Sequence, residues 1–270
     1  MTKIKNSCVL ITGGASGIGR IMGRMALEKG ARQVVIWDIN EQNIATTLAD
    51  FKKIGAAKGF RVDVSNNESV IAAAEQTKRE CGDVDILINC AGIVTGNKTF
   101  DKQTLTDIER TMSINAVAPM VVALQFLPDM IVRDRGHICN IASAAGMISN
   151  PRMSVYAASK WAVIGWSDSV RIELAERKSN VHVTTVAPYY INTGMFDGVR
   201  SRFFPILDPE HTSRKILRAI ERNTDFRGIP WSYHFFRLCQ GLLPVSWFDT
   251  IVGRWLGIYS TMDHFTGRKK

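Results

Sequence analysis

Residues 12–19 read Thr-Gly-Gly-Ala-Ser-Gly-Ile-Gly, and they connect a short apolar run, residues 9–12, to a stretch with helical periodicity, residues 21–26. Glycine lets the backbone approach a pyrophosphate closely, while the first turn of a helix offers unpaired N–H groups and the positive end of the helix dipole. A tight strand-to-helix turn can also require glycine for steric reasons alone. The stretch therefore predicts a strand, a glycine-rich turn and a helix, with dinucleotide binding as its functional interpretation.

Short apolar runs recur along the chain, and each is followed by a segment with helical periodicity. Buried parallel strands read as continuous apolar runs, and right-handed crossovers place the intervening helices on both faces of one twisted sheet. The pattern therefore predicts an α/β fold with a single Rossmann-type, doubly wound parallel sheet. The expected strands are residues 9–12, 34–37, 59–62, 86–89, 137–141 and 181–186.

The composition changes after about residue 203, where the strand pattern fades and large apolar residues become frequent. We therefore divide the chain into a dinucleotide-binding Rossmann segment with the candidate catalytic residues, 1–203, and a hydrophobic C-terminal helical extension of the same domain, 204–270. Within this extension, residues 226–259 interleave Trp, Phe and Leu with three arginines. Such a segment suits a membrane interface, a lid over a substrate pocket or a contact between subunits, and the sequence leaves these alternatives open.

The bulk composition restricts the class of protein. With 270 residues, 46% of them hydrophobic, the chain can bury one large α/β core without metals or disulfides. The five cysteines are odd in number and lack metal-ligand spacing, so we expect a reduced, cytoplasmic setting and no metal site. The formal charge is +9, but the basic residues are dispersed, so nucleic-acid binding is not expected. We also expect no secretion signal and no membrane-spanning helix, while peripheral contact with a membrane stays open.

An acidic residue stands at the end of the second expected strand. Asp38 lies about 20 residues after the glycines, where a carboxylate accepts hydrogen bonds from the adenosine ribose of NAD and repels the 2′-phosphate of NADP. Ile39 follows it and Ser16 lies inside the turn, so neither neighbouring position supplies a basic residue for that phosphate. The sequence therefore predicts NAD as the cofactor.

A tyrosine and a lysine four residues apart carry the candidate chemistry. Tyr156 and Lys160 fall on the same face of an expected helix, so their side chains can meet. A neighbouring ammonium favours the phenolate by charge attraction, and we therefore expect Lys160 to make Tyr156 usable as a base near neutral pH. Ser143 follows the fifth expected strand, at the edge where open α/β sheets bind ligands, and its hydroxyl is placed to orient a substrate oxygen.

Over roughly its first 200 residues the chain resembles the short-chain dehydrogenase/reductase family, because these motifs occur in the family's order and spacing. The resemblance implies a catalytic tetrad of Asn115, Ser143, Tyr156 and Lys160. Within it, Asn115 fixes a water that continues the proton relay from Lys160, which also holds the cofactor ribose. The cofactor-binding residues that the motifs and the resemblance assign are Thr12, Gly13, Ser16, Gly17, Ile18, Gly19, Asp38, Ile39, Asp63, Val64, Asn89, Ala91, Gly92, Tyr156, Lys160, Pro188, Ile191 and Thr193.

Two positions depart from the family pattern. Cys90 stands where the family often has a second asparagine, so a structural side-chain hydrogen bond is in doubt while cofactor binding should survive. Tyr189 replaces the usual glycine after Pro188 and adds an aromatic wall near the reacting groups. Together with residues 188–196 and 208–210, it resembles the retinol dehydrogenase and 17-beta-hydroxysteroid dehydrogenase branch. Members of that branch commonly carry an N-terminal hydrophobic anchor, which we do not expect here.

These features predict an NAD-dependent oxidoreductase that interconverts a lipophilic alcohol, such as a retinoid, a steroid or a long-chain alcohol, and its carbonyl, with Tyr156 as general acid and base. The alternative is a non-catalytic NAD(H)-binding sensor or interaction module on the same fold. We expect a homodimer or homotetramer. The expected substrate wall consists of Ser143, Ala145, Met147, Met153, Tyr156, Tyr189, Met195, Phe196, Phe203 and Phe204.

Overall fold

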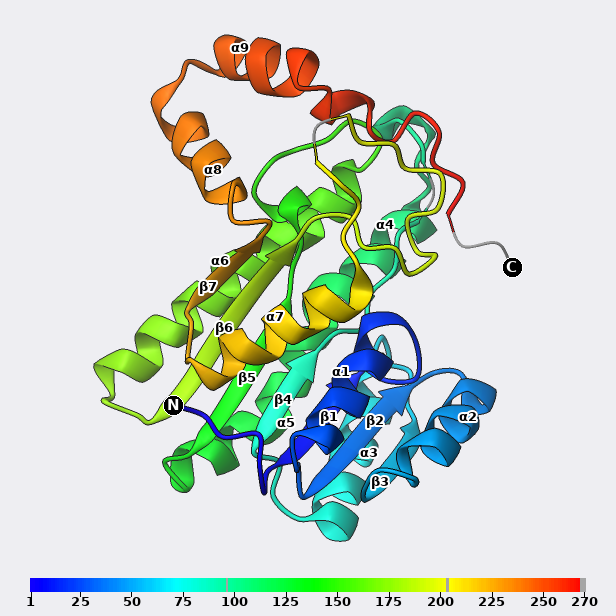
Figure 1. The fold of residues 1–270 in the computed structure, drawn as a ribbon, viewed down its shortest axis with the longest axis vertical. Helices are drawn as coiled ribbons and strands as arrows, with labels where there is room; N and C mark the ends of the chain where they lie inside the picture. Colours follow the sequence, from blue (N-terminus) through cyan, green and yellow to red (C-terminus); the bar gives the residue numbers. More distant parts are fainter. Residues whose placement is uncertain (96, 203, 268–270) are drawn as a thin grey trace.

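Seven parallel strands form one twisted sheet in the order β3-β2-β1-β4-β5-β6-β7 (Figure 1). The computed structural model describes residues 1–95, 97–202 and 204–267. The strand order reverses between β1 and β4, and open α/β sheets bind their ligands at such a switch point. The strands are β1 (Cys8–Thr12), β2 (Gln33–Asp38), β3 (Ala57–Arg61), β4 (Ile86–Asn89), β5 (Gly136–Ile141), β6 (Val181–Pro188) and β7 (Phe226–Ile229).

Helices cover both faces of the sheet, with α1, α2 and α7 on the face nearest the viewer and α3, α5 and α6 behind (Figure 1). The helices of the Rossmann segment are α1 (Gly17–Glu28), α2 (Glu41–Phe51), α3 (Asn67–Cys81), η1 (Phe100–Lys102), α4 (Leu105–Met112), η2 (Ser113–Val117), α5 (Ala118–Val132), η3 (Ala144–Gly146) and α6 (Ser154–Glu176). Those of the C-terminal segment are α7 (Pro209–Glu221), α8 (Tyr233–Leu242), α9 (Val245–Phe248), η4 (Asp249–Trp255) and η5 (Ile258–Ser260).

The strand residues alternate between two hydrophobic cores. In β1, Val9 and Ile11 join the core under α1, α2 and α7, whereas Cys8 and Leu10 join the core under α3, α5 and α6. Successive side chains of a strand point to opposite faces, so a strand that is apolar throughout buries both faces at once. The continuous apolar runs of the sequence therefore mark the centre of the doubly wound sheet.

The predicted Rossmann-type sheet is confirmed, and each of the six expected strands overlaps an observed one. The seventh strand, β7, was not predicted, because Phe226-Arg227-Gly228-Ile229 is short and contains an arginine and a glycine. It pairs with β6 at the edge of the sheet, so the sheet extends into the C-terminal segment. The sheet therefore continues past residue 203, where the strand pattern of the sequence fades.

One continuous helix, Leu105–Val132, is long and apolar enough to cross a membrane by length and composition. It comprises α4, η2 and α5, and α5 packs against α3, β4 and β5 of the domain. A helix that packs on a sheet requires an apolar face, so its contacts within the core account for much of this composition.

The C-terminal segment closes the carboxyl edge of the sheet. After β7 the chain forms α8 and α9, which project beyond this edge, and then returns across the top of the molecule (Figure 1). The buried side chains of this segment, including Tyr233, Phe236, Phe248 and Val252, form a third hydrophobic cluster with Tyr189 and residues of α6. The predicted hydrophobic helical extension is thus present.

Candidate active site

The glycine-rich turn packs so closely that side chains are excluded from it. Gly13 has a positive φ of 66°, and a Cβ there would lie 2.9 Å from the Cα of Ala91. A Cβ on Gly19 would lie 2.3 Å from the carbonyl oxygen of Gly13. Gly13 needs glycine for its left-handed backbone and for lack of space, and Gly19 needs it for lack of space alone. The turn therefore leaves the start of α1 open toward a ligand.

Side-chain hydrogen bonds fix this turn to the neighbouring strands. Thr12 Oγ1 accepts hydrogen bonds from the backbone N–H groups of Cys90 and Ala91, at 3.1 and 3.2 Å. Asp38 Oδ2 accepts one from the N–H of Ala15 at 3.1 Å, and its Oδ1 accepts one from Asn40 at 3.1 Å. Asp38 thus lies at the end of β2, as expected, and its carboxylate also stabilises the glycine turn through these hydrogen bonds.

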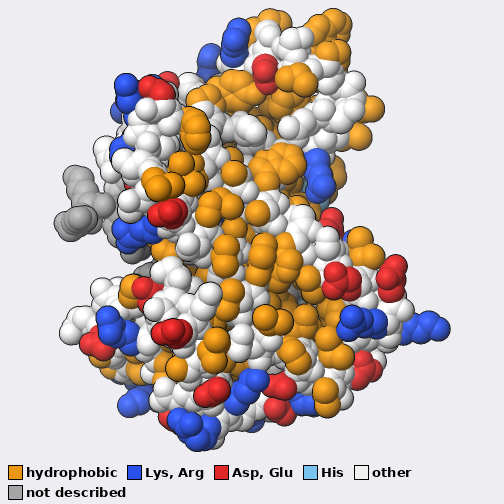
Figure 2. Space-filling model, turned by 180° about the vertical axis from the view of Figure 1, so that it is seen from behind, with side chains coloured by type: hydrophobic (Ala, Val, Ile, Leu, Met, Phe, Trp, Pro, Cys, Tyr) orange, Lys and Arg blue, Asp and Glu red, His pale blue; other side chains and the backbone are white. Residues whose placement is uncertain are grey.

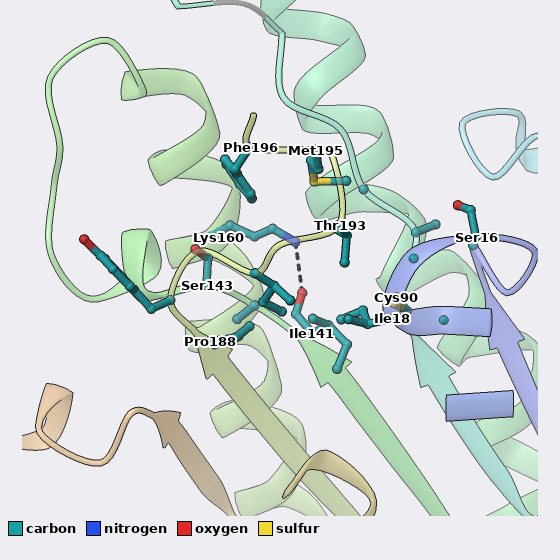
Figure 3. A pocket seen from close by; sticks show the side chains of 18 of the residues that line it. Ser16, Ile18, Cys90, Ile141, Ser143, Lys160, Pro188, Thr193, Met195 and Phe196 are labelled. Carbon is teal, nitrogen blue, oxygen red and sulfur yellow. Dashed lines mark hydrogen bonds between the residues drawn. The ribbon is translucent and has the colours of Figure 1, made fainter. Parts of the chain in front are cut away.

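A pocket of about 150 Å³, open to solvent, lies at the carboxyl edge of the sheet above the switch point. The glycine turn forms one side of it, and the loops after β4, β5 and β6 form the others (Figure 3). Its lining residues are Gly13, Ser16, Gly17, Ile18, Gly19, Cys90, Ala91, Gly92, Ile141, Ala142, Ser143, Tyr156, Lys160, Pro188, Tyr189, Ile191, Thr193, Met195 and Phe196. The structure therefore brings together twelve of the expected cofactor-binding residues and five of the expected substrate residues in one pocket.

Lys160 is buried, and its Nζ donates a 2.9 Å hydrogen bond to the carbonyl oxygen of Ile141 (Figure 3). Its Nζ lies 5.8 Å from the centre of the Tyr156 ring, so the expected proximity on one helix face is observed. Burial lowers the pKa of Lys160 to about 8, because removal from water disfavours the charged form.

Burial raises the pKa of Tyr156 to about 12, and a side-chain hydrogen bond with Ser143 opposes this only in part. The pKa of Tyr156 thus lies above its ordinary value, whereas the sequence leads us to expect that Lys160 favours the phenolate. The physical reason is that Lys160 points to the Ile141 carbonyl group while the phenol lies in an apolar surround. Burial therefore favours the phenol form of Tyr156, which donates a proton, over the phenolate form, which accepts one.

Asn115 lies in η2, a π-helical turn between α4 and α5, and such turns occur often at functional sites. Its Oδ1 accepts a hydrogen bond from the N–H of Ile93, and its Nδ2 donates to the carbonyl oxygen of Ile93 and to Ser159 Oγ. Ser159 Oγ in turn donates to the carbonyl oxygen of Tyr156. Asn115 is therefore connected to the catalytic helix α6 through Ser159, a residue that the sequence analysis did not single out.

The other expected cofactor residues surround the pocket without lining it. Thr12 and Asn89 lie beneath its floor, and Asn89 Nδ2 donates to Asn140 Oδ1 at 2.9 Å. Asp38 ends β2, and the exposed Ile39 follows it. Asp63 and Val64 follow β3, where Asp63 Oδ1 accepts hydrogen bonds from Ser65.

Some residues of the expected substrate wall line the first pocket, and the others lie beyond it. Ala145 lines a second cavity, which shares Ser143, Tyr189 and Phe196 with the first and extends beneath the C-terminal segment. Met147 and Met153 are buried, and the Tyr190 hydroxyl contacts Met153 Sδ at 3.5 Å. Phe204 packs against Tyr189, Tyr233 and Phe236, and Phe203 lies outside the described residues.

Several lining residues were not predicted as site residues. Three of them end a strand or directly follow one, so their position at the carboxyl edge of the sheet could have been predicted from the expected strands. They are Cys90, Ile141 and Ala142. Asn150, Tyr190, Tyr233 and Ile258 line the second cavity. Tyr233 and Ile258 come from the C-terminal segment, whose path across the sheet has no local sequence signal.

The residues present fit a nicotinamide dinucleotide. A side chain at Gly13 or Gly19 would fill the cradle at the start of α1, and a Cβ at Gly92 would lie 3.7 Å from Lys160 Nζ. Because Gly17 lies against Thr193, the loop after β6 covers the same cradle. A glycine turn of this kind, together with Tyr156 and Lys160 at the same edge of a Rossmann sheet, fits the class of nicotinamide-dependent oxidoreductases.

Comparison with known proteins agrees with this class. The family model for short chain dehydrogenase matches residues 7–202, and the chain belongs to this family of oxidoreductases. It is 36% identical to epidermal retinol dehydrogenase 2 of Mus musculus over 99% of this chain and 87% of that protein. It is 35% identical to estradiol 17-beta-dehydrogenase 11 of Homo sapiens over 89% of this chain and 80% of that protein.

Solved structures show the same fold. A short-chain dehydrogenase/reductase from Burkholderia phymatum, in complex with NAD, superposes with a TM-score of 0.77 at 23% identity. The match covers 94% of this chain and 97% of that one. A putative short-chain dehydrogenase from Novosphingobium aromaticivorans superposes with a TM-score of 0.76, also at 23% identity, over 93% of this chain and 88% of that one. The predicted family and its retinol and steroid dehydrogenase-like branch are thus confirmed.

Proposed function

We propose that the protein is an NAD-dependent dehydrogenase that interconverts a lipophilic alcohol and its carbonyl, with Tyr156 as general acid and base. The observation that carries the proposal is the buried Tyr156, which lines one pocket together with Ser143, Lys160 and the glycine turn. When bound, the cofactor supplies or accepts the hydride. Ser143 orients the substrate oxygen, and Tyr156 takes the hydroxyl proton in oxidation and returns it in reduction.

The other tetrad residues support this proton transfer. Lys160 would hold the cofactor ribose, and Asn115 would fix a water that continues the proton path from Lys160. Gly13, Gly17 and Gly19 would let the backbone reach the pyrophosphate, and Asp38 would accept hydrogen bonds from the adenosine ribose.

The walls beside Tyr156 favour a large apolar substrate. Phe196 contacts Tyr156 edge-on, with ring centres 6.0 Å apart, and Tyr190 packs against both Phe196 and Tyr189. Aromatic walls of this kind bind apolar groups. The names of two relatives, a retinol dehydrogenase and an estradiol dehydrogenase, agree with this substrate class.

Cofactor absorbance with a panel of retinoids, steroids and long-chain alcohols tests the proposed activity directly. Turnover with at least one class supports it, and a sugar or a small polar acid as the best substrate would refute the apolar pocket. Binding of NADH without turnover of any alcohol or carbonyl in the panel would favour the non-catalytic sensor.

Replacement of Asp38 should change the choice between NAD and NADP. Asp38→Ala removes the charge that repels the 2′-phosphate, so we expect kcat/KM for NADP to rise at least ~10-fold relative to NAD. Asp38→Asn is the matched control for the structural role of Asp38, since its amide oxygen can still accept a hydrogen bond from the N–H of Ala15 or Asn40. Steady-state kinetics with both cofactors measure the ratio. A wild-type preference for NADPH would contradict the assignment of NAD.

The pKa of Lys160 predicts a pH dependence of cofactor use. Below about pH 8 Lys160 is an ammonium group, and above it the charge is lost. We expect kcat/KM for the reduced cofactor to fall as pH rises through about 8, because this parameter reports groups of the free enzyme. Tyr156, with its pKa raised to about 12, remains a phenol over this range. A profile that stays flat between about pH 6 and pH 10 would contradict this role for Lys160.

We also propose a cytoplasmic homo-oligomer, a dimer or tetramer. Val117, Leu124, Trp161 and Ile172 are exposed on η2, α5 and α6. Hydrophobic side chains gather over the middle of the face seen from behind (Figure 2). Apolar surface of this kind favours a contact between subunits, and light scattering gives the mass of the assembly.

A further inference from the structure

The helices α8, α9 and η4 each carry two apolar faces. In α8, Tyr233 and Phe236 are buried in the third hydrophobic cluster, while Phe235, Leu238 and Leu242 are exposed. The exposed residues are spaced three and four positions apart, which places them on one side of the helix. The inward face already completes the fold, so the outward face is not required for packing within the chain.

The same division continues in α9 and η4. Phe248 and Val252 are buried, whereas Trp247, Ile251 and Trp255 are exposed at intervals of four residues. Trp231, which precedes α8, and Val245, the first residue of α9, add to the exposed set. We call the eight exposed side chains the outer apolar surface; they are Trp231, Phe235, Leu238, Leu242, Val245, Trp247, Ile251 and Trp255. We call α8, α9 and η4 together the projecting arm, and Figure 2 shows hydrophobic side chains along it.

Positive charge accompanies the outer apolar surface. Residues 226–262 contain three arginines and a single acidic residue, Asp249. Asp249 Oδ1 accepts a 2.5 Å hydrogen bond from the Tyr259 hydroxyl, and Arg237 and Arg254 are exposed. Trp and Phe beside arginine suit the boundary between lipid headgroups and acyl chains, and the charge attracts anionic headgroups.

We propose that the outer apolar surface docks the protein onto an anionic lipid bilayer, with α8, α9 and η4 lying in the headgroup region. A lid function does not explain this surface, because the inward residues Tyr233 and Ile258 already line the second cavity. The arm projects beyond the carboxyl edge of the sheet, the edge that carries the active-site pocket (Figure 1). Docking would therefore place the pocket near a bilayer, where lipophilic compounds concentrate.

Vesicle co-sedimentation of the full chain tests the proposal without reference to turnover. We expect the wild type to sediment with phosphatidylcholine vesicles that contain phosphatidylserine, and to bind less when phosphatidylserine is omitted or salt is added. The double variant Trp247→Gln/Trp255→Gln should lose at least ~10-fold in vesicle affinity, because it removes two of the interfacial aromatic side chains.

A matched pair of leucines controls for general loss of surface hydrophobicity. Leu242 is 73% exposed on the outer apolar surface, and Leu105 is 69% exposed at the start of α4. Leu242→Gln should weaken vesicle binding and Leu105→Gln should not. NADH fluorescence of each variant reports whether the cofactor site is folded.

Three outcomes would overturn the proposal. The first is wild-type protein that stays in the supernatant with anionic vesicles at low salt. The second is vesicle binding that the tryptophan variant leaves unchanged, which would place the lipid contact elsewhere. The third is a wild-type oligomer that does not bind vesicles and that the tryptophan variant dissociates, which would make this surface a contact between subunits.

Discussion

Replacement of Tyr156 by phenylalanine should lower kcat by roughly 10²- to 10⁴-fold, the usual contribution of a positioned acid or base. The substitution removes only the hydroxyl group. The ring remains packed edge-on against Phe196, and Ser143 still lines the same pocket. We therefore expect NADH to bind Tyr156→Phe with close to wild-type affinity. Stopped-flow kinetics and fluorescence titration separate these two effects.

The matched control for this variant is Tyr259→Phe. Burial and Asp249 raise the pKa of Tyr259 to about 12 as well, but its hydroxyl group donates to Asp249 in the C-terminal segment, away from the glycine turn. Turnover of Tyr259→Phe should stay near that of the wild type, although its thermal stability should fall. If Tyr156→Phe retains more than about a tenth of wild-type kcat, proton transfer by Tyr156 is refuted.

The sequence predicts the centre of the fold well because buried parallel strands leave a simple signal. β1, β2 and β4 are apolar on both faces, and each lies between two cores. The edge strand β7 escapes prediction for the opposite reason. Its register with β6 is set by the tertiary path of the chain, and its own four residues include Arg227 and Gly228.

Site residues can be predicted from the sequence where the chemistry requires a particular residue type at a fixed spacing. They cannot be predicted where tertiary packing alone brings a residue to the site. The glycine turn, Tyr156 and Lys160 have fixed spacing, and the structure gathers them in one pocket. The pKa of Tyr156 cannot be predicted from spacing alone, because it depends on burial and on where Lys160 points. Tyr233 enters the second cavity from a distant segment, which no local motif could reveal.

The glycine turn gives the second large effect, since replacement of Gly19 by alanine should strongly weaken cofactor binding. The added Cβ would lie 2.3 Å from the carbonyl oxygen of Gly13 and 3.2 Å from the Cα of Gly14. Both neighbours are backbone, so the clash cannot be relieved by rotating a side chain. Overpacking costs about 1–3 kcal/mol, and displacement of the turn should raise the Kd for NADH by up to roughly 100-fold.

Gly165→Ala is the matched control, because a Cβ there meets nothing within 4 Å on the exposed side of α6. Alanine in a helix is favoured over glycine by roughly 0.5–1 kcal/mol, so this variant should bind NADH normally and unfold at a higher temperature. Fluorescence titration and thermal unfolding of both variants distinguish a local clash from general destabilisation. Wild-type NADH affinity in Gly19→Ala would show that the cofactor does not lie on the start of α1. The dinucleotide would then have to bind elsewhere in the pocket, and the proposed hydrogen bonds between Asp38 and the adenosine ribose would be refuted as well.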